Sequence, residues 1–65
     1  MNSYTIRELA NQSSYREGYT AYANTLADAK RMAVRKQAFH GTVLTIEDET
    51  GFVMSTRIAR RWRDQ

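Results

Sequence analysis

The feature that most constrains the fold is an alternating pattern of apolar and polar residues between Thr42 and Ile58. Two β-branched stretches, at about residues 42–48 and 52–59, flank the turn-forming sequence Asp48-Glu49-Thr50-Gly51, which is the pattern of a β-hairpin. If Gly51 takes the left-handed position of a turn followed by a bulge, Ile46 lies opposite Met54. A shift of one residue would turn the apolar side chains to the other face, so the pattern predicts one register.

A single helix is expected before this hairpin, over about residues 25–39. Thr25 is a good N-cap, and Asp28, three residues later, complements the helix dipole. No glycine or proline occurs between residues 26 and 39, and Leu26 and Ala33 share one apolar stripe. Gly41 is expected to end the helix as a left-handed C-cap.

Two further strands are expected near the start of the chain. The sequence alternates at about residues 3–8, passes through a polar turn, and becomes rich in tyrosine and threonine at about residues 18–23. The resulting order is β-β-α-β-β, in one α+β domain spanning residues 1–65. We predict a small antiparallel sheet with one helix packed on one face, an uncovered second face, and a basic C-terminal segment at residues 57–63. The core is predicted to contain Leu26, Ala33, Leu44, Ile46, Met54 and Ile58, with Ile6 and one tyrosine.

Composition narrows the setting of the protein. The chain has 65 residues, 42% of them hydrophobic, and no cysteine. A secreted domain of this size would usually need disulfides, so we expect a cytoplasmic protein. No run of about 20 uncharged residues occurs, so no membrane partner is expected. So small a core gains from self-association, which makes a homodimer a further expectation.

The sequence offers no constellation for catalysis or for metal binding. His40 is the only histidine, and no serine or cysteine is spaced to form a nucleophilic site with it. The acidic run at residues 47–49 lacks the spacing of a calcium loop and is better interpreted as a solvated hairpin turn. We therefore expect a non-enzymatic protein without catalytic residues, metal or cofactor.

Eight of the ten basic residues fall in the helix and in the last nine residues. Arginine clusters bind phosphate, and a tryptophan among them can stack on an exposed base. The candidate nucleic-acid-binding residues are Arg31, Arg35, Arg57, Arg60, Arg61, Trp62 and Arg63. The alternative is an ordinary solvated helix face, with Trp62 closing the core.

The uncovered sheet face is the other candidate surface. Exposed apolar patches often mark protein–protein contacts, although antiparallel sheets commonly leave one face to water. The candidate interface residues are Tyr22, Val43, Thr45, Val53 and Ser55. They would serve a dimeric adaptor or a phage-type inhibitor of a host protein.

Several stretches of the chain resemble short orphan proteins of bacteria and their temperate phages. These stretches are residues 19–23, 26–37 and 41–44, with the closing pair Arg61-Trp62. The resemblance covers about two-thirds of the chain and implies a bacterial cytoplasmic setting, with no activity to carry over. The first hypothesis is therefore an accessory protein that binds nucleic acid through its basic C-terminal segment, and the alternative is a protein-interaction module.

Overall fold

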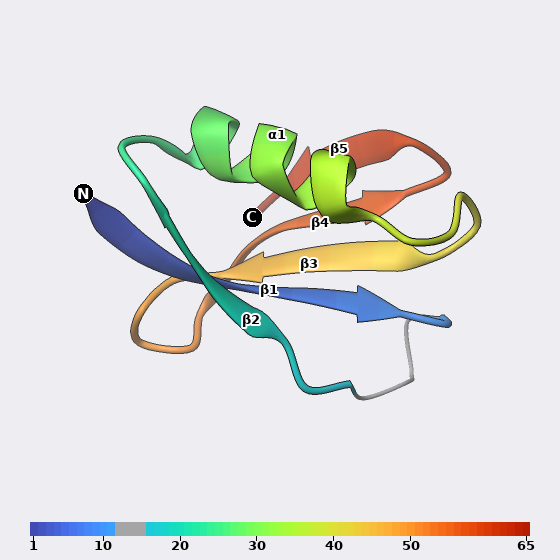
Figure 1. The fold of residues 1–65 in the computed structure, drawn as a ribbon, viewed down its shortest axis with the longest axis horizontal. Helices are drawn as coiled ribbons and strands as arrows, with labels where there is room; N and C mark the ends of the chain where they lie inside the picture. The colour runs from blue at the N-terminus through green and yellow to red at the C-terminus, as the bar shows by residue number, and fades with distance from the viewer. Residues whose placement is uncertain (12–15) are drawn as a thin grey trace.

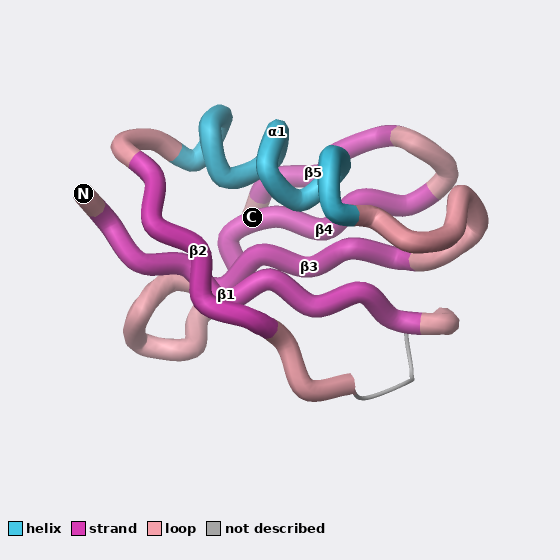
Figure 2. The backbone as a smooth tube through the Cα atoms, viewed as in Figure 1, coloured by secondary structure: helices cyan, strands magenta, loops and turns pink. Residues whose placement is uncertain are grey.

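The computed structural model describes residues 1–11 and 16–65, which form one helix and an antiparallel sheet (Figure 1). The elements are β1 (Asn2–Leu9), β2 (Tyr19–Ala23), α1 (Leu26–Lys36), β3 (Val43–Glu47), β4 (Val53–Ile58) and β5 (Arg61–Asp64). The strand order is β2-β1-β3-β4-β5, and α1 lies across one face of this sheet (Figure 2). The predicted α+β class is confirmed. The strand β5 was not predicted, because most of its residues, Arg61 to Arg63, were assigned to the basic segment at residues 57–63.

The helix begins as predicted and ends early. The Thr25 hydroxyl accepts a hydrogen bond from the backbone N–H of Asp28 at 3.2 Å, which confirms the N-cap. The helix stops at Lys36, because Gln37 has an extended backbone. The predicted left-handed C-cap at Gly41 is wrong, since Gly51 is the glycine with a positive φ in the described structure.

The register of the β3–β4 hairpin differs by one residue from the predicted one. Ile46 pairs with Ser55 rather than with Met54, and an irregularity between Ile46 and Glu47 brings Glu47 opposite Val53. The turn itself is as predicted: Gly51 has a φ of 92°, and the Asp48 N–H donates to the Phe52 carbonyl at 2.9 Å. The shift places Ser55 on the helix side of the sheet.

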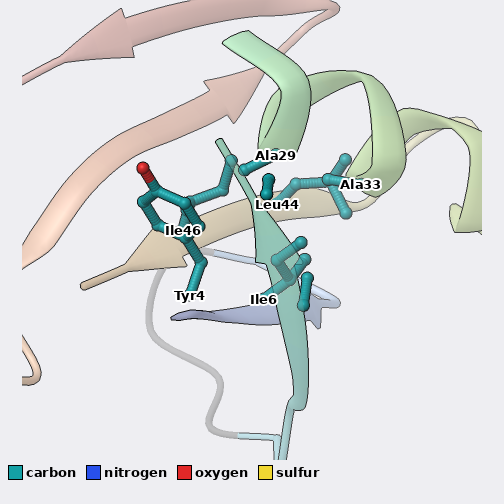
Figure 3. Close-up of a cluster of buried hydrophobic side chains, with 8 residues drawn as sticks. Tyr4, Ile6, Ala29, Ala33, Leu44 and Ile46 are labelled. Carbon is teal, nitrogen blue, oxygen red and sulfur yellow. The ribbon is translucent and has the colours of Figure 1, made fainter. Parts of the chain in front are cut away.

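The core lies between α1 and the sheet (Figure 3). Ile6, Leu44 and Ile46 are fully buried beneath Ala29 and Ala33, whose small side chains let the helix approach the strands closely. The remaining buried members of this cluster are Tyr4, Ala21 and Ala23. Three residues predicted as core, Leu26, Met54 and Ile58, are only half-buried. Among the described residues, α1 lacks the length and hydrophobicity of a membrane-spanning helix.

Candidate protein-interaction groove

The structure divides the predicted nucleic-acid-binding residues between the two faces of the sheet. Arg57 pairs with Trp62 across β4 and β5, whereas Ile58 pairs with Arg61. Neighbouring side chains on a strand point to opposite faces. Trp62 therefore lies on the helix side of the sheet, whereas its sequence neighbours Arg61 and Arg63 are exposed on the other side. The predicted set therefore does not form one patch.

Trp62 takes the core-closing role that the sequence left open. Its half-buried ring packs against the hydrophobic cluster, and the Lys30 ammonium lies 5.7 Å from the ring centroid. Lys30 also forms an ion pair with Asp64 at 2.7 Å. The basic segment is thus fixed to the helix as a strand, and Trp62 is held against the protein.

The second predicted surface, the uncovered sheet face, is smaller than expected. Ser55 is on the wrong side for this surface: it is 0% exposed, and its hydroxyl donates to the carboxylate of Asp64 at 2.7 Å. Val43 is buried, and Thr45 and Val53 are half-buried. Only Tyr22 among the five candidates is exposed, at 62%. The Arg7–Glu47 ion pair, at 2.7 Å, makes the face more polar still.

A groove lies on the helix side of the molecule, between the end of α1 and the turn that joins β4 to β5. Its volume is about 310 Å³. The lining residues are Val34, Gln37, Ala38, Phe39, His40, Arg57 and Arg60. Two large apolar side chains are exposed here, Val34 at 39% and Phe39 at 72%. The groove combines apolar surface with arginine, which is the composition of many protein-binding sites.

Glu8 on β1 organises the loop that carries Phe39. Its carboxylate accepts hydrogen bonds from the backbone N–H groups of Ala38 at 2.9 Å and Phe39 at 3.0 Å. In a continuing helix these two N–H groups would bond to carbonyls four residues earlier, so Glu8 ends the helix by binding them instead. The Thr42 hydroxyl also donates to Glu8, at 2.7 Å.

The charge of Glu8 is stabilised by the same contacts. Burial acts to raise the pKa of Glu8, but the hydrogen bonds from the Ala38 backbone, the Thr42 hydroxyl and the Phe39 backbone outweigh it. The net pKa is therefore below the ordinary value. The carboxylate is the anchor of the loop at neutral pH.

Gln37 links this loop to β4. Its side-chain amide donates to the Thr42 hydroxyl at 3.1 Å, and its carbonyl oxygen accepts from the Arg57 guanidinium at 3.0 Å. Arg57 is half-buried and Arg60 is exposed. The floor of the groove is therefore joined by hydrogen bonds from the loop to the sheet.

The turn that joins β4 to β5 contains an unusual backbone. Ala59 has a φ of 52° and Arg60 a φ of 66°. Two-residue hairpin turns with both central φ values positive strongly favour asparagine and glycine. L-residues with side chains pay a steric cost in this region. Such strain is often found at functional positions, and here it places Arg60 in the wall of the groove.

Arg57 and Arg60 were among the predicted site residues, whereas Val34, Phe39 and His40 were not. Phe39 was expected to be the last residue of the helix, and its exposure depends on Glu8, which lies 31 positions earlier in the chain. The available signal was a large aromatic residue outside the apolar stripe of the helix.

No protein-family model and no curated protein sequence matches the chain. Among solved structures, the fold is similar to that of AcrIF9, a small phage anti-CRISPR protein. The two chains are 40% identical, with a TM-score of 0.89, and the match covers 100% of this chain and 88% of AcrIF9. This agrees with the resemblance to small phage proteins. Identity at this level over the full length shows common descent as well as a common fold, and the chain therefore belongs to the AcrIF9 family.

Proposed function

We propose that this protein is a phage-type inhibitor that acts in the cytoplasm of a bacterial cell by binding a protein component of a CRISPR system. The observation that carries the proposal is the full-length similarity to AcrIF9, at 40% identity. It favours the protein-interaction hypothesis over the nucleic-acid hypothesis. An inhibitor of this kind works as a binding protein and needs no catalytic group.

The groove is the proposed docking surface, because it combines exposed apolar side chains with arginines, whereas Tyr22 is the only exposed residue among the five candidates of the uncovered sheet face. The groove combines the exposed Phe39 and Val34 with Arg57 and Arg60. Aromatic residues and arginine are enriched among the residues that contribute most to protein-binding energy. The hydrogen bonds that hold the loop in place reduce the entropy lost on binding.

The function is tested by expressing the chain in bacteria whose CRISPR system is inhibited by AcrIF9, and then infecting them with a phage that this system targets. We expect the plaque count to rise to the level obtained with AcrIF9. If AcrIF9 restores plaques and this chain, produced at the same level, does not, the proposed function is wrong.

The docking surface is tested with two phenylalanines that are both exposed. Phe39 lies in the groove, and Phe52, 57% exposed, lies at the β3–β4 turn. Phe39→Ser should weaken inhibition, whereas Phe52→Ser should leave it unchanged, because only Phe39 would contact the partner. Equal effects of the two substitutions would argue against the groove.

Nucleic-acid binding is a second candidate, now restricted to the uncovered face. Arg61 and Arg63 are both exposed and line a groove of about 470 Å³ with Thr56 and Gln65. Two arginines on one surface can contact neighbouring phosphates. If they do, binding to duplex DNA should weaken steeply with salt and should be lost when both are replaced by serine. Homodimer formation also stays a prediction, and sedimentation at increasing concentration would test it.

A further inference from the structure

The two arginines of the groove form no ion pair with a carboxylate among the described residues. The three ion pairs of the described residues, Arg7–Glu47, Lys30–Asp64 and Arg31–Asp28, use other basic groups. Within the described residues, Arg57 donates to an amide, and neither Arg57 nor Arg60 forms an ion pair with a carboxylate. Both arginines line the groove, so two cations are available to a partner.

The groove also contains no acidic lining residue. Its other lining groups are the apolar side chains of Val34, Ala38 and Phe39, with neutral Gln37 and the exposed His40. A guanidinium group binds a carboxylate through two parallel hydrogen bonds, and an exposed aromatic ring gains most from an apolar side chain. These two requirements are met together by a peptide in which carboxylates and apolar side chains alternate closely.

The strained turn supports a recognition role for Arg60. A two-residue turn of this type would be less strained with glycine at residues 59 and 60. The chain instead has Ala59 and Arg60 at positive φ, so a guanidinium group is kept at the rim of the groove at a conformational cost. Arg61, the next residue, lines the groove on the opposite face of the sheet and cannot serve the same contact.

We propose that the groove binds an acidic, apolar segment of the partner protein, with a carboxylate on Arg57 and Arg60 and an apolar side chain against Phe39 and Val34. This inference rests on the proposed function, since it names the chemistry of the partner at the same docking surface. The size of the groove, about 310 Å³, suits a few side chains rather than a folded element.

A nucleic-acid backbone is the competing occupant, and the lining disfavours it. Phosphate contacts would use Arg57 and Arg60 but would leave Val34 without an apolar partner. The other two arginines of the hairpin, Arg61 and Arg63, are on the far face and would not extend the contact along a strand of DNA.

The test is a titration of the isotope-labelled full chain with three probes, followed by NMR. The probes are a short peptide of alternating leucine and glutamate, its analogue with glutamine in place of glutamate, and a short duplex DNA. We expect the acidic peptide to shift the signals of Phe39, His40, Arg57 and Arg60 and to bind at least about tenfold more tightly than the glutamine analogue, because charge pairing with arginine is lost in the analogue.

Two variants with the same change in net charge provide the control. Arg60→Glu should weaken binding of the acidic peptide about tenfold or more, because repulsion replaces attraction. Arg61→Glu should leave it unchanged, because Arg61 lies on the opposite face. Retained chemical shifts of Ile46 and Leu44 would show that both variants are folded.

The proposal is overturned if the glutamine analogue binds as tightly as the acidic peptide, if only DNA shifts the groove signals, or if no probe shifts them. These outcomes are independent of the plaque assay, because the titration contains no CRISPR component. A chain that restores plaques but does not bind the acidic peptide would retain the proposed function and refute this partner chemistry.

Discussion

The two turns at the ends of β4 both reverse the chain with backbone at positive φ, but they use different residues to do so. The β3–β4 turn uses Gly51 at a φ of 92°, and the Asp48 carboxylate accepts hydrogen bonds from the backbone of Thr50 at 2.9 Å and of Phe52 at 3.0 Å. The β4–β5 turn places Ala59 and Arg60 at positive φ. Figure 1 shows the second turn near the end of α1 and the first at the opposite end of the sheet.

We interpret the β3–β4 turn as one that stabilises the fold and the β4–β5 turn as one that positions the Arg60 side chain. Every residue choice in the Asp48–Gly51 turn agrees with the local backbone, whereas the β4–β5 turn violates the usual preference at two positions. Local violations of this kind are expected where function requires a particular residue. The violating turn is also the one that lines the groove.

The largest expected effect on stability is at Gly51. Gly51→Val should lower the free energy of unfolding by about 1–2 kcal/mol, because a β-branched residue resists a positive φ. No atom lies within 4 Å of the position where a Cβ would be built, so the cost comes from the backbone alone. Urea denaturation measures it, and Gly41→Val is the control, because Gly41 is equally open and has no positive φ. Equal losses of unfolding free energy in Gly51→Val and Gly41→Val would show that the positive φ of Gly51 is not the cause.

The β4–β5 turn should respond in the opposite sense. Ala59→Gly and Arg60→Gly should each raise the free energy of unfolding by about 0.5–1 kcal/mol, since glycine removes the strain but adds entropy to the unfolded chain. Only Arg60→Gly should weaken inhibition in the plaque assay. If neither variant is more stable than the parent protein, the turn is not strained. Its positive φ angles then no longer support a functional role for Arg60.

A smaller effect concerns acid and the loop held by Glu8. Because the pKa of Glu8 is lowered in the folded protein, its contribution is complete above the unfolded value, about 4.3, and is lost as pH falls through the lower folded pKa. We expect the amide signals of Ala38 and Phe39 to move together in that range. Glu8→Gln should remove the transition. An unchanged titration of these signals in the variant would assign the anchoring to another group.

The Asp48 turn offers a comparison within the same titration. The Thr50 hydroxyl and then the Phe52 backbone lower the pKa of Asp48, against a burial effect that acts to raise it. The Thr50 amide signal should therefore also shift with pH, at pH values below the ordinary pKa of aspartate. The groove signals should not shift with it. Protonation of Glu8 would then loosen the loop that carries Phe39, and protonation of Asp48 would loosen the β3–β4 turn.

Local sequence patterns predicted the parts of the fold that depend on near neighbours. The Thr25 N-cap and the Gly51 turn needed only residues within a few positions, and both are present. The pairing of β3 with β4 was predicted, but its register was wrong by one residue, because the irregularity between Ile46 and Glu47 is not visible in the local sequence pattern. Ser55 can be buried under the helix because β5 supplies acceptors for its hydroxyl, the Arg63 carbonyl and the Asp64 carboxylate.

The candidate site was predicted in part for the same reason. Arg57 and Arg60 could be named from charge alone, but their separation from Arg61 and Arg63 required a strand that the sequence did not reveal. The exposure of Phe39, in the loop after α1, depends on a hydrogen bond from its own backbone to Glu8 on the distant strand β1. Contacts between distant segments leave no periodic pattern in the sequence.

We propose that the helix-side groove, with Arg60 at its rim, is the surface that binds the CRISPR component. The most direct measurement is the affinity of the Arg60→Glu and Arg61→Glu variants for the purified CRISPR complex that AcrIF9 inhibits. We expect Arg60→Glu to bind at least about tenfold more weakly than the parent protein and Arg61→Glu to bind as the parent does. Unchanged binding of Arg60→Glu, or loss of binding confined to Arg61→Glu, would contradict the account.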